Sequence, residues 1–187
     1  PLDFHSPYGN SKGAADQYTR DNHRIYGIKT VVFRQSCIYG EHQRGTEDQG
    51  WVAYFMIRGI LGQSLTVYGN GKQVRDILHI NDLVHAYLLA TEKIEKVQGH
   101  IYNIGGGIEN TFSLLEMLEF LETLLKKTIH YDIAPWRPGD QKVFISDNTA
   151  VHRDLGWKIR YPAKKGLTAL YIWIAAHLKE IRNACNG

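Results

Sequence analysis

The order of apolar and polar residues predicts a helix and then a buried strand in the first part of the chain. A Ser-Pro pair at residues 6–7 is a typical helix start, because serine caps and proline is tolerated at the first helical position. Gly27 is a typical helix end, so a helix is expected over residues 7–26. The β-branched, apolar run at residues 29–34 predicts a buried strand of a parallel sheet. A helix followed by such a strand is half of an α/β unit, so an α/β fold is expected.

The pattern after residue 35 predicts loops and then a more irregular α+β arrangement. Loops are expected over residues 35–50, with a turn at Asn70-Gly71. Strands or extended segments are predicted at residues 65–68, 76–80, 101–104 and 142–145. Helices are predicted at residues 51–61, from Asn81 or Asp82 to about 96, at 113–127, from Asp147 to 155, and at 163–181.

Composition narrows the protein class. Hydrophobic residues make up 43% and charged residues 22%, which are values of a globular domain. The net charge of +3 is small and the basic residues are scattered among acids, so no nucleic-acid partner is expected. No apolar run approaches the ~20 residues that span a bilayer, so no membrane association and a cytoplasmic location are expected. Cys37 and Cys185 lie far apart and no metal-ligand spacing occurs, so neither a disulfide framework nor a metal site is predicted.

The first motif that carries chemistry is Tyr8-Gly9-Asn10-Ser11-Lys12. Positions i and i+4 of a helix lie on one face, so the phenol and the ammonium would be neighbours. A free phenol titrates near pH ~10 and is a poor base at neutral pH, but a nearby ammonium favours the phenolate. Such a pair can remove a hydroxyl proton while hydride leaves the same carbon. Taken alone, the pattern is more often an exposed tyrosine–lysine pair, and its position before a buried strand favours the catalytic interpretation.

Three further segments place polar groups where a ligand would bind. Arg34–Gly40 follows the buried strand, and ligands of α/β sheets bind beyond the carboxyl ends of strands. Gly69–Asp76 and Trp136–Asp140 would each present an arginine, Arg75 and Arg137, whose fork suits a diphosphate. The alternatives are an ordinary strand exit, a surface hairpin and a plain loop.

A glycine run at residues 105–107 follows a strand but does not match a dinucleotide fingerprint. That fingerprint requires Gly-x-Gly-x-x-Gly, and Asn110 stands at the third glycine position. We therefore expect a tight strand-to-helix turn. Because Pro1-Leu2-Asp3-Phe4 also reads like the interior of a loop, the chain is expected to be the C-terminal part of a longer enzyme. The pyrophosphate-binding loop of a dinucleotide cofactor is therefore not expected within this chain.

The motifs occur in an order that resembles a known family. The chain is similar, over nearly all of its length, to the C-terminal half to two-thirds of the extended short-chain dehydrogenases/reductases, the NAD-dependent nucleotide-sugar epimerases and dehydratases. The motifs that carry the resemblance are Tyr8-x-x-x-Lys12, Arg34 to Gly40, Gly69-x-Gly71-x-Gln73-x-Arg75-Asp76, Asn103-Ile104-Gly105-Gly106, Arg137-Pro138-Gly139-Asp140 and Leu155-Gly156-Trp157. The resemblance implies the C-terminal part of a Rossmann-type parallel sheet and a small α+β substrate-binding domain.

The resemblance also implies roles for individual residues, with NAD as the cofactor. Tyr8 would be the catalytic base, and Lys12 would hold the nicotinamide ribose and tune Tyr8. The main chain near Arg34 and Ser36 would meet the nicotinamide end. The nucleotide-sugar pocket would be formed by Cys37, Gln49, Gly50, Trp51, Arg75, Arg137 and Asp140. Among these, Arg75 and Arg137 would clamp the diphosphate and Asp140 would reach a ribose hydroxyl. Many relatives have Asn at the position of Cys37, and Pro at the position of Glu41.

The predicted function is epimerisation of a nucleotide-activated sugar through a transient keto intermediate. The stretches at residues 11–18, 48–52 and 71–76 are most similar to members that act on CDP-linked deoxy sugars. A 4-epimerase or 4,6-dehydratase of UDP-, GDP- or dTDP-sugars is the alternative, and a non-catalytic nucleotide-sugar-binding fragment is another. Residues 1–35 are assigned to the NAD-binding domain and residues 36–187 mainly to the sugar-nucleotide domain, with 75–104 returning to the Rossmann sheet. The family resemblance implies a homo-oligomer built through the Tyr-x-x-x-Lys helix.

Overall fold

The computed structural model describes residues 4–185, so the first three residues of the predicted N-terminal loop lie outside it. Its elements, in chain order, are α1 (Pro7–Tyr26), β1 (Val32–Gln35), β2 (Cys37–Tyr39), α2 (Trp51–Leu61), β3 (Leu65–Tyr68), β4 (Val74–His79), α3 (Ile80–Glu92), α4 (Ile94–Val97), β5 (Ile101–Ile104), η1 (Ile108–Asn110), β6 (Thr111–Ser113), α5 (Leu114–Leu125), β7 (Tyr131–Ala134), β8 (Val143–Phe144), α6 (Thr149–Leu155), α7 (Ala163–Ala176) and α8 (Leu178–Cys185). The expected α/β class is confirmed.

Several elements have the predicted bounds because their ends are capped locally. The side chain of Ser6 accepts the Gly9 N–H at 3.0 Å, and Gly27 closes α1 in the left-handed conformation with φ 65°. The helix α2 ends in the same way at Gly62. β3 and β5 also coincide with their predictions. The predicted turn at Asn70 is present, although β3 and β4 do not pair with each other as a hairpin.

Three strands were not predicted: β2, β7 and the short β6, which pairs antiparallel with β4. Residues 35–50 were expected to be loops, but they contain β2, which pairs in parallel with β4. The strand β7 pairs in parallel with β3, and its residues are mostly exposed, so the chain there lacks the apolar signal of a buried strand. The strand predicted at 29–34 begins later, at Val32.

Two predicted helices are each broken into two. The backbone leaves the helical region at Lys93, which separates α3 from α4, and again at His177, which separates α7 from α8. The predicted cap of α3 at Asn81 or Asp82 is also wrong. His79 caps this helix, since its Nδ1 accepts the Asn81 N–H at 3.3 Å.

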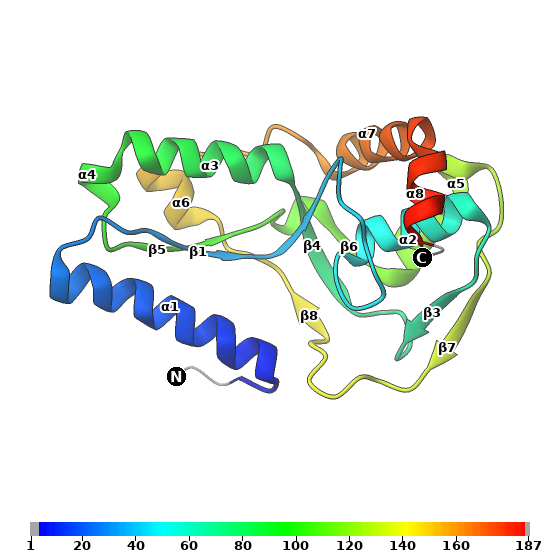
Figure 1. Cartoon of the computed structure of the whole chain (residues 1–187), viewed down its shortest axis with the longest axis horizontal. Coiled ribbons are helices and arrows are strands. Elements are labelled where there is room, and N and C mark those ends of the chain that lie inside the picture. Colours follow the sequence, from blue (N-terminus) through cyan, green and yellow to red (C-terminus); the bar gives the residue numbers. More distant parts are fainter. Residues whose placement is uncertain (1–3, 186–187) are drawn as a thin grey trace.

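The strands form three small sheets that helices cover from several sides. β1 pairs in parallel with β5, β4 pairs with β2, β6 and β8, and β3 pairs with β7. Figure 1 shows β1 and β5 between α1 on one side and α3 with α6 on the other, whereas α2, α5, α7 and α8 gather at the opposite end. The layers around β1 are those of an α/β sandwich. The division into two domains near residue 35 stays a prediction.

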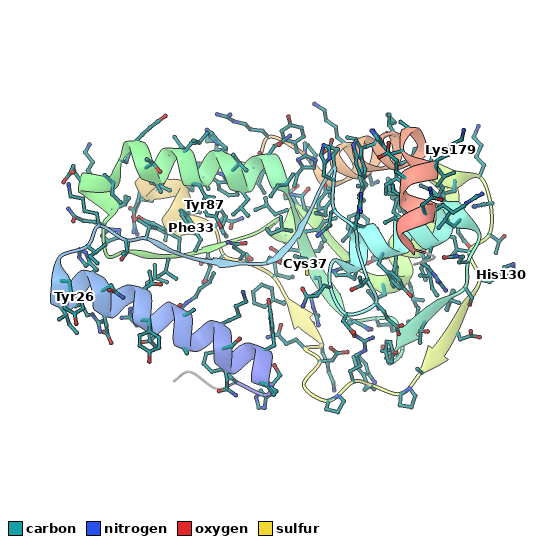
Figure 2. All side chains as sticks on the ribbon, viewed as in Figure 1. Tyr26, Phe33, Cys37, Tyr87, His130 and Lys179 are labelled. Carbon is teal, nitrogen blue, oxygen red and sulfur yellow. The ribbon has the colours of Figure 1, made fainter. Side chains whose placement is uncertain are left out.

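The strand β4 contributes to two hydrophobic cores. Successive side chains of a strand point to opposite faces, and Ile77 lies in the core with α2, α5 and α7 while Leu78 lies in the core with α3, β5 and α6. Phe33 of β1 packs on Tyr87 of α3 with ring centroids 5.3 Å apart, on the margin of the second core (Figure 2). β4 therefore holds the two ends of the molecule together.

A buried carboxylate fixes the segment that leads into α7. Asp82 is fully buried on α3 and accepts the N–H groups of Arg160, at 3.1 and 3.2 Å to its two oxygens, and of Tyr161, at 3.0 Å. Its carbonyl accepts the indole N–H of the buried Trp157 at 2.8 Å. Backbone N–H groups that would otherwise be orphaned are thus satisfied by one side chain.

The predicted tight turn at residues 105–107 is confirmed, and its glycines serve close packing. A Cβ on Gly106 would lie 2.2 Å from the Ile77 carbonyl oxygen, and one on Gly105 would lie 2.3 Å from an Asp76 carboxylate oxygen. The turn leads into the short 3₁₀ helix η1 and then into β6, and not directly into an α-helix. Among the described residues, no helix is both long enough and apolar enough to cross a membrane.

Candidate active site

Tyr8 and Lys12 lie on the first turns of α1 with their polar ends unengaged. The Lys12 ammonium is 5.5 Å from the centroid of the Tyr8 ring, and the Tyr8 residue is 60% exposed. Within residues 4–185, neither the Tyr8 hydroxyl nor the Lys12 ammonium has a hydrogen-bond or ion-pair partner. A phenol and an ammonium on one helix face can accept the proton of a hydroxyl group and donate hydrogen bonds to a diol.

Arg34 and Ser36, at the carboxyl end of β1, are engaged within the protein. Arg34 forms a two-pronged ion pair with Asp16 of α1, at 2.6 and 3.2 Å, and this hydrogen bonding raises the pKa of its guanidinium. Ser36 donates its hydroxyl to Asp76 and its N–H to the Ile104 carbonyl at 2.9 Å. Their side chains therefore brace β1 against α1 and β4, and neither is free for a cofactor.

Cys37, at the start of β2, and Trp51, at the start of α2, lie close together beside the core that includes α2, α5 and α7. Cys37 lies in the middle of the molecule (Figure 2), where β1 passes into β2. Burial raises the pKa of the Cys37 thiol, and the nearby indole N–H of Trp51 offsets part of that rise. The indole nitrogen is buried, and among the described residues it has no acceptor in hydrogen-bond geometry.

Arg75 lies on β4 close to Cys37 and faces the chain before β8. Its guanidinium donates to the Val74 carbonyl at 2.9 Å and to the Gln141 carbonyl. Its charge also lowers the pKa of Cys37, though less than burial raises it. The structure thus brings Cys37, Trp51 and Arg75 together.

The turn at residues 137–140 lies next to the start of α1. A Cβ on Gly139 would lie 3.2 Å from the His5 carbonyl oxygen, three residues before Tyr8. The Asp140 N–H donates to the Arg137 carbonyl at 3.2 Å and closes the turn, and the exposed Asp140 carboxylate has no partner within residues 4–185. Figure 1 shows the N-terminal end of α1 beside the long connection from β7 to β8. The predicted diphosphate clamp and catalytic pair are therefore neighbours.

Arg137 stacks on an aromatic ring and meets two carboxylates. Its guanidinium carbon is 3.8 Å from the centroid of the Tyr68 ring, and its two terminal nitrogens are each 3.3 Å from carboxylate oxygens of Glu47 and Asp48. The hydrogen bond with Tyr68 and these charges raise the pKa of Arg137. Gln49 is exposed in the loop before α2, and Gly50 begins α2 with φ 72°.

Three acidic residues that were not predicted as part of the site contact its predicted residues. Asp76 is fully buried and accepts the Gly107 N–H at 3.0 Å, the Ser146 N–H at 3.1 Å and the Ser36 hydroxyl. Its signal in the sequence is a carboxylate directly before the apolar residues Ile77 and Leu78 of β4. Its partners, two backbone N–H groups and the Ser36 hydroxyl, lie far away in the chain. Glu47 and Asp48 were also missed, because their partner is 90 positions away.

Comparison with known proteins identifies the family of the chain. The sequence model of the NAD dependent epimerase/dehydratase family matches residues 1–105. CDP-paratose 2-epimerase of Salmonella typhi is 43% identical over 180 residues, which are 94% of this chain and 53% of that protein.

Two solved structures share the fold. The UDP-glucose 4-epimerase of Thermotoga maritima, solved with UDP-glucose, has a TM-score of 0.83 and 29% identity, and the match covers 92% of this chain and 54% of that one. A dTDP-glucose 4,6-dehydratase of Streptomyces venezuelae, solved with NAD, has a TM-score of 0.86 and 26% identity over 96% of this chain and 54% of that one. The chain spans about half the length of the curated relatives that it matches. The predicted family is thus confirmed, and the chain belongs to the NAD dependent epimerase/dehydratase family.

Proposed function

We propose that the protein containing this chain is an NAD-dependent epimerase of a nucleotide-activated sugar. The observation that carries the proposal is the Tyr8–Lys12 pair on α1, whose polar groups have no hydrogen-bond or ion-pair partner within residues 4–185. Tyr8 follows by three residues His5, which contacts the turn of residues 137–140. The contact supports a site in which Tyr8 accepts the proton of a sugar hydroxyl and Arg137, from the adjacent turn, binds a diphosphate. The similarity to CDP-paratose 2-epimerase supports a CDP-linked deoxy sugar as the substrate.

The residues present fit the reactive end of NAD. The Lys12 ammonium supplies donors for ribose hydroxyls, and the Tyr8 hydroxyl is exposed next to it. A bound NAD would supply reversible hydride chemistry at the sugar carbinol carbon. A contact between the nicotinamide end and the main chain near Arg34 and Ser36 stays a prediction. The Ser36 N–H already donates to the Ile104 carbonyl, so another main-chain group would have to make this contact.

Each residue of the site then has one task. Tyr8 removes the proton of the carbinol hydroxyl as the ketone forms and gives it back when the alcohol re-forms. Lys12 favours the phenolate through its charge. Arg75 and Arg137 bind the diphosphate, and Asp140 accepts a ribose hydroxyl. Cys37, Gln49, Gly50 and Trp51 line the pocket of the nucleotide sugar.

A thermal-shift experiment on the natural gene product that contains this chain tests the proposal. CDP-, UDP-, GDP- and dTDP-hexoses are compared, and the CDP-sugar is expected to raise the melting temperature most. Arg137→Gln should reduce the shift with every nucleotide sugar, whereas Arg182→Gln, an exposed arginine of α8, should not. Equal shifts for all four nucleotides would contradict the CDP assignment, and undiminished shifts in Arg137→Gln would contradict the clamp.

Assembly through α1 belongs to the same proposal. The helix exposes Tyr18, Ile25 and Tyr26, which are between 67% and 73% exposed. Large apolar side chains at this density on one helix favour a covered surface, as the predicted homo-oligomer would provide.

A further inference from the structure

The loop between β2 and α2 contacts Arg137 through two acidic residues, Glu47 and Asp48. Glu47 and Asp48 stand at the tip of a turn, where Thr46 and Gln49 exchange backbone hydrogen bonds of 2.8 and 3.3 Å. We call residues 45–50 the acidic turn. A Cβ on Gly45 would lie 2.3 Å from the backbone nitrogen of Tyr54, and Gly50 has a left-handed φ of 72°. The turn is therefore compact and flanked by two glycines that its backbone requires.

Both terminal nitrogens of Arg137 are occupied by this turn. One is 3.3 Å from Asp48 and 3.5 Å from the Glu47 carbonyl, and the other is 3.3 Å from the Glu47 carboxylate. The Arg137 guanidinium stacks on the Tyr68 ring, and the Tyr68 hydroxyl donates a hydrogen bond to the Glu47 carboxylate. The two carboxylates thus fill the fork that planar or tetrahedral oxyanions use.

A diphosphate and these carboxylates compete for the same donors. Phosphate oxygens would replace the carboxylate oxygens at the guanidinium, and like charges at such short range repel each other. The acidic turn must therefore release Arg137 when a diphosphate binds. The acidic turn ends directly before Trp51, a residue of the proposed sugar pocket. Release of the turn from Arg137 therefore also allows the backbone before Trp51 to move.

We propose that Glu47 and Asp48 form an autoinhibitory contact, an internal competitor that lowers the affinity of Arg137 for the diphosphate of the substrate. The inference rests on the proposed function, which assigns the diphosphate to Arg137. The affinity for the diphosphate then depends on displacement of the acidic turn. The turn contacts Arg137 when no ligand is bound and rearranges when a diphosphate binds.

Calorimetric titration of the natural gene product with CDP and with cytidine, at low salt, tests this inference. The Glu47→Gln/Asp48→Asn variant is expected to bind CDP about 3- to 10-fold more tightly, because two exposed ion pairs each contribute modestly. Cytidine has no diphosphate, so its affinity should not change. The matched control Glu109→Gln/Glu119→Gln removes two exposed carboxylates that lie elsewhere, near η1 and on α5, and it should leave CDP affinity unchanged.

Combination with Arg137→Gln separates failure of the inference from failure of the proposed function. In the Arg137→Gln background, the gain from Glu47→Gln/Asp48→Asn should disappear. If Arg137→Gln weakens CDP binding but the acidic-turn variant binds CDP as wild type does, the inference is overturned and the diphosphate site stands. If Arg137→Gln leaves CDP affinity unchanged, or no variant binds CDP, the proposed diphosphate site itself is overturned.

Hydrogen exchange gives a readout that does not depend on affinity. Backbone amides of residues 45–50 should exchange faster in Glu47→Gln/Asp48→Asn and in Arg137→Gln than in wild type. Unchanged exchange in both variants would show that the acidic turn is not held by Arg137, and would overturn the inference.

Discussion

Replacement of Tyr8 by phenylalanine is expected to lower kcat of the natural gene product by about 10²- to 10⁴-fold, the range of a lost general base. The ring and the helix remain, because the Tyr8 hydroxyl has no partner within residues 4–185 whose loss would disturb the fold. The affinity for the nucleotide sugar should therefore stay within about twofold, since that affinity depends on the arginine clamp. Initial rates and equilibrium titration of the same preparation measure both quantities.

A second tyrosine on the same helix provides the control for Tyr8→Phe. Tyr18 is 73% exposed and has no proposed part in catalysis, so Tyr18→Phe should retain wild-type kcat. Retained turnover in Tyr8→Phe would remove Tyr8 from the role of base. A loss of substrate affinity equal to the loss of kcat would assign it to binding instead.

Replacement of Asp82 by alanine is expected to have the largest effect on stability. The carboxylate is fully buried and satisfies the N–H groups of Arg160 and Tyr161. Hydrogen bonds to a charged acceptor contribute about 1.5–3 kcal/mol each, so the loss of two should lower the free energy of unfolding by about 3–5 kcal/mol. Urea unfolding at neutral pH measures this change.

The matched control for Asp82→Ala lies on the same helix. Glu92 is exposed at the end of α3, and Glu92→Ala should change the free energy of unfolding by less than about 0.5 kcal/mol. The free energy of unfolding of Asp82→Asn should lie between those of Asp82→Ala and Glu92→Ala, because the amide oxygen keeps one hydrogen-bond acceptor. Equal stability of Asp82→Ala and Glu92→Ala would show that the buried carboxylate does not hold the segment before α7.

Local signals predicted the elements that are fixed locally. The helix α1 carries both of its caps in the sequence, Ser6 and Gly27, and α2 ends at Gly62, so their predicted bounds are correct. The strand β7 could not be predicted, because its residues are exposed and its only support is pairing with β3. The strand β2 is likewise defined by its partner β4.

The candidate site shows the same division between local and distant causes. The Tyr8–Lys12 pair is a helix-spacing feature and could be predicted from the order of residues. The ion pair of Arg34 with Asp16 and the contacts of Arg137 with the acidic turn join distant segments, and no local pattern indicates them. The side chain of Arg34 binds Asp16 of α1, whereas the family resemblance placed only the main chain near Arg34 at the nicotinamide end. Whether its main chain meets the cofactor stays a prediction.

The central claim is that the natural gene product inverts a sugar carbon by removing and returning the hydrogen of that carbon. Its most direct test uses a CDP-linked deoxy sugar with deuterium on the carbinol carbon, followed by NMR of the product. The account predicts an inverted product that keeps its deuterium at that carbon and gains no hydrogen from the solvent there. Exchange of the deuterium with solvent, or a product that has lost water instead of changing configuration, would contradict it.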